Sequence, residues 1–238
     1  MSQNGSAANE HAGRVREMFA TIAGRYDLLN HLLSGNTDKR WRRMVANRVR
    51  DKLSSKSARV LDVACGTGDL SITLFEITGA GVVGTDFCRP MLEIAAGKTS
   101  GRISLIEGDA LDLPFRDGTF DAVTIAFGLR NLSSVESGLA ELSRVVKPGG
   151  WVAVLEFSRP VNAVLRPLFN LYFSKLLPWM GGLISGSRSA YIYLPASVRK
   201  FPDQSQLSLL MEQAGFVQVG YENLTGGIAA LHMGRRPL

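Results

Sequence analysis

The chain has 238 residues, of which 45% are hydrophobic, and carries a formal net charge of +6. This length and composition indicate a globular protein with a well-filled core, built as one domain or as one domain with a substantial insertion. A run of about 18 uncharged apolar residues does not occur, so we expect no membrane span. The cysteines, Cys65 and Cys88, lack metal-ligand or disulfide-framework spacing and favour a reducing cytoplasm.

The amino-terminal stretch divides into a polar tail and a helical segment. Residues 1–13 are small and polar and lack the apolar region of a secretory signal, so we expect a disordered tail. Residues 14–55 are expected to form N-terminal helices, because apolar side chains recur there at helical spacing, as in Val15, Met18, Phe19 and Ile22.

From Ala58 onward, short apolar runs alternate with helical segments. Candidate strands cover residues 59–64, 81–86, 103–109, 120–127 and 151–157, and candidate helices cover residues 69–78, 89–98 and 134–146. The Lys147–Gly150 stretch, KPGG, is expected to end the last helix before the last strand begins. Strand–helix alternation predicts a parallel sheet covered on both faces, with a cofactor-binding core at residues 56–160.

The alternation is interrupted at residues 161–205, which we interpret as a lid and substrate insertion. Residues 206–238 then hold a helix and two strands, 217–224 and 227–234, which follow each other through a short turn and should pair antiparallel. Residues 14–238 are therefore expected to form a single domain.

The first candidate strand leads into a glycine loop, LDVACGTGDL. Gly66 and Gly68 let the backbone approach a ligand, and the next helix presents its amino end there. A dinucleotide site needs a third glycine, which this loop lacks, and the carboxylates of Asp62 and Asp69 disfavour an anionic pyrophosphate. S-adenosylmethionine, with a sulfonium and an amino acid head, suits these acids better.

Further acids stand at the ends of the next candidate strands. Asp86 follows the second strand and can accept hydrogen bonds from ribose hydroxyls, and Asp109 follows the third and can accept from an adenine amino group. Each acid alone is more often a helix N-cap. In register with the glycine loop, they together predict an S-adenosylmethionine site.

Several motifs resemble those of the quinone-biosynthesis C-methyltransferases, the demethylmenaquinone methyltransferases and their relatives acting on the ubiquinone precursor. They are LDVACGTGDL, GTDFCRPML, EGDALDLPFRDGTFDAV, FGLRN, RVVKPGG and LEFSRP. The similarity continues through RYDLLNHLLSGNTDKRWRR, YIYLPASVRKFPDQ and NLTGGIAALHMG, and so covers nearly everything after Arg14. The glycine loop alone would indicate only a class I methyltransferase, whereas FGLRN, LEFS and RYDLLN are far more specific.

The resemblance implies an α/β class I methyltransferase fold, Rossmann-like, with a seven-stranded mixed sheet, an antiparallel final strand, N-terminal helices and a helical lid insertion. It implies contacts to S-adenosylmethionine from Asp62, Ala64, Gly66, Thr67, Gly68, Asp86, Phe87, Asp109, Ala110 and Ala126. Relatives often have a small hydroxyl residue near the position of Ala126, so this chain departs from the pattern there.

The reaction implied is methyl transfer to a ring carbon of a polyprenylated hydroquinone, with no metal required. Arg130 would stabilise the developing phenolate, because an opposite charge nearby typically lowers the pKa of an acid by about 1–3 units; an ion pair closing the mouth of the strand is the alternative. Since arginine is not deprotonated in proteins, a water, Tyr26, Asp27 or His232 would take the proton, although a structural role for His232 is the alternative. Substrate contacts are expected from Arg130, Asn131 and Tyr191.

Basic residues gather in two places. The stretch from Phe157 to Pro202 contains no acid but holds Arg159, Arg166, Lys175, Arg188, Arg199 and Lys200, and a second cluster spans Lys39–Arg50. Such patches attract nucleic acid or an anionic membrane, or are simply solvated. Residues 162–184 within the first are amphipathic. They either pack on the core as a lid helix or form the mouth for the prenyl tail on the bilayer.

Two other functions compete with quinol methylation. An RNA or DNA methyltransferase is favoured by the basic charge, but enzymes that methylate base amino groups generally end this strand with acceptors, whereas AFGLRN ends with a donor. A catalytically silent subunit would not need Asp62, Asp86 and the glycine loop. We therefore expect a quinol lipid and an anionic membrane surface as partners, no nucleic acid, and a cytoplasmic protein on the inner face of the plasma membrane. Monomer and homodimer both stay open.

Overall fold

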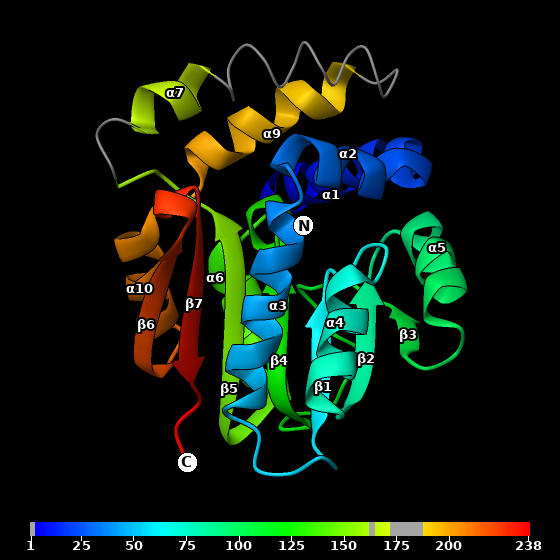
Figure 1. Ribbon diagram of the computed structural model, residues 1–238, viewed down its shortest axis with the longest axis vertical. Helices are drawn as coiled ribbons and strands as arrows, with labels where there is room; N and C mark the ends of the chain where they lie inside the picture. Colours follow the sequence, from blue (N-terminus) through cyan, green and yellow to red (C-terminus); the bar gives the residue numbers. More distant parts are fainter. Residues whose placement is uncertain (1–2, 162–164, 172–187) are drawn as a thin grey trace.

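A computed structural model describes residues 3–161, 165–171 and 188–238 of the chain (Figure 1). Its centre is a seven-stranded sheet with the strand order β3-β2-β1-β4-β5-β7-β6. Neighbouring strands from β3 to β5 pair in parallel, while β7 is antiparallel to both β5 and β6. The strands are β1 (Arg59–Val63), β2 (Gly81–Asp86), β3 (Ser104–Glu107), β4 (Phe120–Ala126), β5 (Val146–Phe157), β6 (Val217–Leu224) and β7 (Ala229–Arg235). The predicted mixed sheet and its antiparallel final strand are confirmed.

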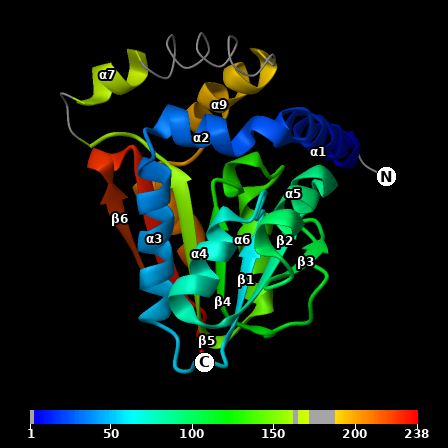
Figure 2. The same cartoon turned by 45° about the vertical axis from the view of Figure 1, so that its right-hand side comes forward.

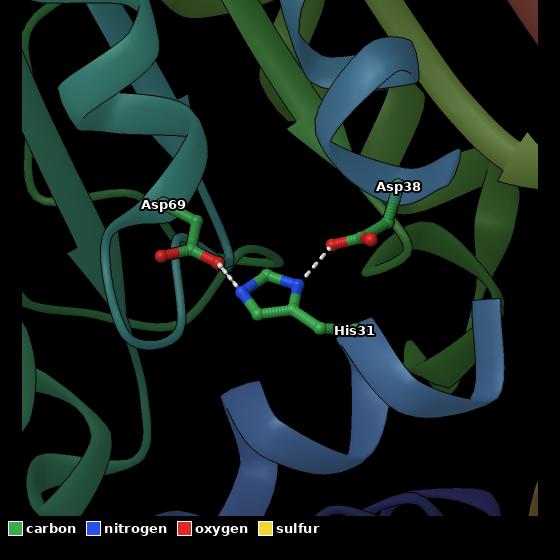
Figure 3. A group of neighbouring side chains, drawn as sticks. All are labelled: His31, Asp38 and Asp69. Atoms are coloured by element: carbon green, nitrogen blue, oxygen red, sulfur yellow. Dashed lines mark hydrogen bonds and ion pairs between the residues drawn. The ribbon is translucent and has the colours of Figure 1, made fainter. Parts of the chain in front are cut away.

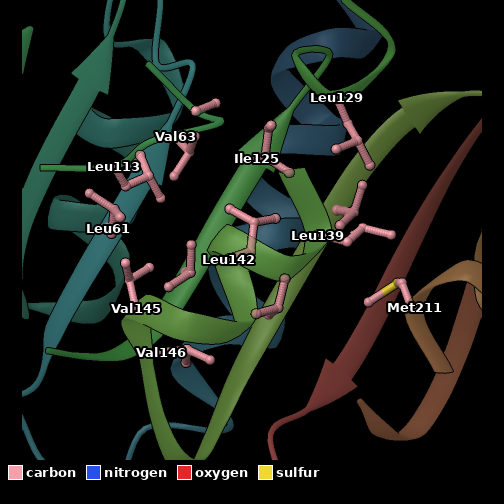
Figure 4. Close-up of a cluster of buried hydrophobic side chains, with 14 of the residues drawn as sticks. Leu61, Val63, Leu113, Ile125, Leu129, Leu139, Leu142, Val145, Val146 and Met211 are labelled. Atoms are coloured by element: carbon pink, nitrogen blue, oxygen red, sulfur yellow. The ribbon is translucent and has the colours of Figure 1, made fainter. Parts of the chain in front are cut away.

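Helices cover both faces of the sheet because consecutive strand residues point to opposite sides and the side chains on both sides are apolar. Val60 packs with α3 (Thr37–Arg50) and α4 (Asp69–Thr78) on one face. Leu61, the next residue, packs with α6 (Val135–Val145) and α10 (Gln204–Gln213) on the other face, in the cluster shown in Figure 4. The strands are thus apolar on both faces, as in the parallel sheets of α/β proteins.

Three amino-terminal elements run across the carboxyl ends of the strands (Figure 2). They are α1 (Gln3–Ile22), η1 (Ala23–Arg25) and α2 (Tyr26–Ser34), and α5 (Arg89–Thr99) lies beneath α1. The predicted disordered tail over residues 1–13 is wrong from Gln3 onward, because α1 begins there. Ala7, Ala8 and Glu10 are good helix formers, so the small polar residues extend the amphipathic helix rather than fray from it.

The carboxyl edge of the sheet also carries α7 (Leu165–Leu171) and α9 (Arg188–Lys200) (Figures 1 and 2). Both belong to the segment interpreted as a lid, which confirms that helices interrupt the alternation there. The predicted amphipathic segment 162–184 lies largely outside the described residues. None of the helices in the described ranges is long and apolar enough to span a membrane.

Strand β5 begins earlier than the sequence predicts. Its first residue, Val146, pairs with Phe120 of β4, and the register shifts before Trp151 pairs with Ala122. Gly150 makes this irregularity possible, since a Cβ there would lie 2.8 Å from the carbonyl oxygen of Asp121. The KPGG stretch, expected to separate helix and strand, therefore forms the irregular start of β5.

Candidate active site

A cavity opens at the carboxyl edge of the strands. Its position beyond the ends of parallel strands is where open α/β sheets bind ligands. Its lining includes these predicted cofactor residues: Ala64, Gly66, Asp86, Phe87, Asp109, Ala110 and Ala126. Phe19 and Tyr26 contribute from the amino-terminal helices, and Asn131 from the segment after β4.

The loop between β1 and α4 shapes one wall of this cavity. Ala64, Gly66 and Gly68 all have positive φ, at 51°, 55° and 82°. A Cβ on Gly66 would meet only the ring of Tyr26, at 4.0 Å, so its backbone faces open space where a ligand can approach. A Cβ on Gly68 would instead lie 3.2 Å from Cβ of Ala95, so Gly68 packs against α5 and does not line the cavity.

Asp86 holds the loop and faces the cavity. Its carboxylate accepts hydrogen bonds from the backbone N–H of Gly66 and of Cys88, both at 2.8 Å. Burial raises the pKa of Asp86, although these hydrogen bonds oppose the shift. Asp109 also lines the cavity, and its Oδ1 accepts from the N–H of Leu111 at 2.9 Å. Two carboxylates on one wall can accept hydrogen bonds from ribose hydroxyls and an amino group, so the residues fit S-adenosylmethionine.

Asp62 lies beneath the loop, not on the cavity wall, contrary to its predicted contact. It is 1% exposed and accepts hydrogen bonds from the hydroxyls of Ser71, at 2.6 Å, and Thr124, at 2.8 Å. Burial raises the pKa of Asp62 to about 6 despite these bonds. Asp62 therefore ties β1 to β4 and α4 beneath the loop.

A polar cluster joins the amino-terminal helices to the loop. Thr67 is also buried away from the cavity, and its hydroxyl donates to Asp27 of α2. Lys98 of α5 forms ion pairs with Asp27, at 2.7 Å, and with Asp69 at the start of α4. Asp27, predicted as a proton acceptor, is thus engaged by two donors and does not line the cavity. We interpret this cluster as a latch that holds α2 against the cofactor loop.

His31, Asp38 and Asp69 extend this cluster and have ligand atoms close enough to hold a metal ion (Figure 3). His31 Nδ1 lies 2.8 Å from Asp38 and His31 Nε2 lies 3.8 Å from Asp69, so the ring bridges the two acids (Figure 3). Arg42 forms ion pairs with both carboxylates, and Lys98 forms one with Asp69, so basic side chains already neutralise these acids. The cluster is therefore a structural network of α2, α3, α4 and α5, and its residues do not suit a divalent metal.

The turn after β4 is strained and strongly held. Phe127 has φ of 55°, which is unusual for a bulky residue. Its carbonyl oxygen accepts hydrogen bonds from Arg130 Nη1, at 2.7 Å, and from the amide of Asn131, at 3.1 Å. Arg130 Nη1 also pairs with Glu156 Oε2 at 2.8 Å, and both side chains are buried. The alternative predicted for Arg130, an ion pair at the mouth of the strand, is therefore present, and Arg130 does not line the cavity.

Glu156 and Tyr193 were not predicted as site residues. Tyr193 of α9 donates its hydroxyl to Asn131 Oδ1 at 3.2 Å, and burial raises the pKa of that hydroxyl while Arg130 lowers it. The pattern LEFS could have indicated Glu156, because a lone acid in a buried strand needs a cation. Tyr191, predicted as a substrate contact, lies in α9, and its side chain is outside the described residues.

The structure also shows where the other two predicted proton acceptors, Tyr26 and His232, lie. Tyr26 lines the cavity beside the ring of Phe19, with 5.9 Å between centroids. Burial raises the pKa of its hydroxyl, while a hydrogen bond with Asn30 and the charges of Arg130 and Arg42 lower it. His232 is 1% exposed on β7, with Nε2 at 2.9 Å from the carbonyl oxygen of Gln204, and it does not line the cavity. The structure thus places His232 between β7 and α10, away from the cavity, a position that agrees with the structural alternative.

The sheet order, the glycine loop beneath a cavity and the acid at the end of β2 define a class I methyltransferase that uses S-adenosylmethionine. A SAM-dependent methyltransferase from Thermotoga maritima, described as a possible histamine N-methyltransferase, has the same fold, with a TM-score of 0.63 and 18% identity over 92% of this chain and 98% of that one.

The chain belongs to the ubiE/COQ5 methyltransferase family, whose model matches residues 6–236. It is 51% identical to the demethylmenaquinone methyltransferase of Thermus thermophilus in an alignment of 224 residues that covers 92% of this chain and 100% of the relative. It is 44% identical to the ubiquinone/menaquinone biosynthesis C-methyltransferase UbiE of Geobacter sp. strain M21, over 97% of this chain and 99% of the relative. The resemblance predicted from the motifs is confirmed.

Proposed function

We propose that the protein transfers the methyl group of S-adenosylmethionine to a ring carbon of a polyprenylated hydroquinone, converting demethylmenaquinol to menaquinol. The observation that carries the substrate is the 51% identity, over the full length of the relative, to a demethylmenaquinone methyltransferase. A benzoquinol of the ubiquinone pathway is the alternative ring, since a relative at 44% identity is named for both quinones.

The chemistry requires the reduced ring. A quinone is electrophilic, whereas the carbon beside a quinol hydroxyl is nucleophilic, and more so when the hydroxyl ionises. The cofactor supplies an electrophilic methyl group on a sulfonium. The protein supplies proximity, which can remove about 7–11 kcal/mol of the barrier, and a site from which water is excluded. Phe19, Phe87 and Leu132 on the cavity wall supply the apolar surroundings.

We assign the ring to the region between Tyr26, Asn131 and Tyr193. Tyr26 and Asn131 line the cavity, and Tyr193 hydrogen-bonds to Asn131 from α9. Arg130 lies behind them, off the cavity wall, with its charge balanced by Glu156, so it holds the turn of Phe127 that lines the cavity more than it presents a net positive charge to the quinol. A water beside Tyr26 takes the proton, because the raised pKa of Tyr26 makes its own phenolate scarce.

We further propose that α7 and α9 belong to a lid through which the prenyl tail enters. Arg159, Arg166, Arg199 and Lys200 are exposed at this end, together with the apolar Val161 and Leu171. Such a mixture suits an anionic bilayer surface, so the protein would work from the cytoplasm on the inner face of the plasma membrane. A homodimer is not required by this arrangement.

The second basic cluster does not favour a nucleic acid substrate. Arg42 is paired with Asp38 and Asp69 inside the protein, and Arg48 is paired with Glu222 at 2.6 Å. Internal partners of this kind neutralise charge that a phosphate backbone would need.

Methyl transfer from labelled S-adenosylmethionine tests the proposal directly. The acceptors are a short-tailed reduced naphthoquinol lacking the ring methyl, the same compound oxidised, the matching benzoquinol and bulk RNA. Label in the reduced naphthoquinol alone is expected. Label in RNA would establish the rival methyltransferase, and cofactor binding without transfer to any acceptor would establish a silent subunit.

A further inference from the structure

We propose that Glu156 is a positioning residue of the methyl-transfer site and acts through Arg130, a role that rests on the quinol methylation proposed above. Glu156 stands near the carboxyl end of β5, beside the end of β4 that carries the strained turn. It is 1% exposed and does not line the cavity, so it does not touch the substrate itself.

The carboxylate of Glu156 is fully engaged with this edge of the sheet. Oε2 accepts from Arg130 Nη1 at 2.8 Å and from the N–H of Phe157 at 3.1 Å. Oε1 accepts from the N–H of Arg130 at 3.2 Å. The same carboxylate therefore fixes both the main chain and the side chain of Arg130, which leaves the guanidinium little freedom to rotate.

The stability of the fold does not require an ion pair at the position of Arg130 and Glu156. Charges buried in a protein interior lose hydration that their attraction repays only with very good geometry, and apolar residues of similar volume often serve the fold as well or better. Val152, Ala153, Val154 and Leu155 precede Glu156 in β5 and are all buried apolar residues. A glutamate at the end of this run indicates a requirement other than stability.

The pair also leaves one donor of the guanidinium without a partner. Arg130 Nε is buried and has no hydrogen-bond partner within the described part of the chain. Buried donors without partners are rare and costly, so the position of this guanidinium needs a reason other than stability. Arg130 does not line the cavity, so it acts on the ring site without touching the quinol. Its charge lowers the pKa of both Tyr26 and Tyr193, whose hydroxyls are assigned to that site.

Glu156 also holds the turn that lines the cavity. By fixing Arg130, it fixes the hydrogen bond from Nη1 to the carbonyl oxygen of Phe127, whose φ of 55° needs such support. Phe127 and Gly128 line the cavity, so a displacement of the guanidinium would move this part of the cavity wall. Misplacement by about 1 Å can reduce a rate by roughly 100-fold.

Two variants test this role with readouts that folding alone would not move. Glu156→Asp keeps the charge but withdraws the carboxylate by one methylene, and Glu212→Asp, at an exposed position of α10, is the matched control. The double variant Arg130→Met/Glu156→Leu replaces the pair by apolar residues of similar volume. For each, kcat and KM with the short-tailed quinol, the Kd of S-adenosylmethionine and the midpoint of thermal unfolding are measured.

We expect Glu156→Asp to lower kcat at least tenfold while the cofactor Kd stays within threefold of the parent. The double variant should unfold at or above the parental temperature and still have low kcat. A kcat of Glu156→Asp within threefold of the parent, with the double variant inactive, would overturn the role of Glu156 and leave that of Arg130. Parental turnover in the double variant would overturn both. A parent that binds the cofactor but does not methylate the quinol would overturn the proposed function itself, and the role of Glu156 with it.

Discussion

Asp62 illustrates how one buried acid can make the stability of a protein depend on pH. Its pKa is about 6 in the folded chain, above an ordinary value of 3.8, so between these pH values the folded chain binds more protons than the unfolded chain. The contribution of Asp62 to the free energy of unfolding therefore falls as the pH rises from 4 to 6, by on the order of 2–3 kcal/mol at about 1.36 kcal/mol per pKa unit.

Asp62→Asn should remove this dependence. The difference in the free energy of unfolding between variant and parent, measured by urea denaturation, should grow in favour of the variant between pH 4 and pH 7. Asp112→Asn, at an exposed position, is the control and should show no such trend. A difference that stays constant across the range would contradict the raised pKa.

Arg130 supports a second prediction at the level of single residues. Arg130→Ala removes the group that holds the turn of Phe127 on the cavity wall and leaves Glu156 buried without its cation, so turnover should fall at least 100-fold, because a displacement of about 1 Å in an active site can reduce a rate by roughly that factor. The Kd of S-adenosylmethionine, measured by calorimetry, should change little because Arg130 does not line the cavity. Arg89→Ala, 73% exposed, is the control. Turnover within a few fold of the parent would disprove the role.

At the scale of elements, the periodicity of apolar residues and the residues that end helices and strands predicted most of the sheet and its helices. They did not predict what the ends of these elements contact. Helix α4 has the predicted bounds, since an acid follows the loop and a glycine follows Thr78. The pairing of Arg130 with Glu156 joins residues 26 positions apart and depends on β4 lying beside β5. A sequence read locally shows a free arginine there. For the same reason it does not show that Asp62 lies beneath the loop, or that the side chain of Thr67 bonds to Asp27 rather than lining the cavity.

The latch between α2 and the cofactor loop gives a prediction about elements. Lys98→Met keeps the length of the side chain but leaves Asp27 and Asp69 as neighbouring like charges, so α2 should bind the loop less tightly. Because α2 contributes Tyr26 to the cavity wall, S-adenosylmethionine should dissociate about three- to tenfold faster, as a loss of roughly 1 kcal/mol at a partly exposed pair implies. Stopped-flow release measures this, and Lys39→Met, exposed on α3, is the control. An unchanged rate would show that the latch does not control release.

At the scale of the whole molecule, exposed basic and apolar residues lie together at one end of the fold. Counting charged residues along the sequence was enough to find the acid-free basic stretch. Its position in space depends on the fold, which brings α7 and α9 to the carboxyl edge of the sheet (Figure 1). The cavity opens at the same edge. The prenyl tail in a bilayer and the cofactor would therefore both lie at the carboxyl edge of the sheet.

Salt-sensitive binding to anionic vesicles tests this arrangement. Arg166→Glu/Lys200→Glu reverses two exposed charges at the lid end, and each basic residue near an anionic surface contributes about 1 kcal/mol. The partition coefficient for vesicles with phosphatidylglycerol should therefore fall at least 30-fold in flotation at low salt. Lys56→Glu/Arg116→Glu makes the same change in net charge in the turns before β1 and β4, at the opposite edge, and should bind nearly as the parent does. Equal losses in both variants would mean that net charge alone, rather than the lid end, attracts the protein to the membrane.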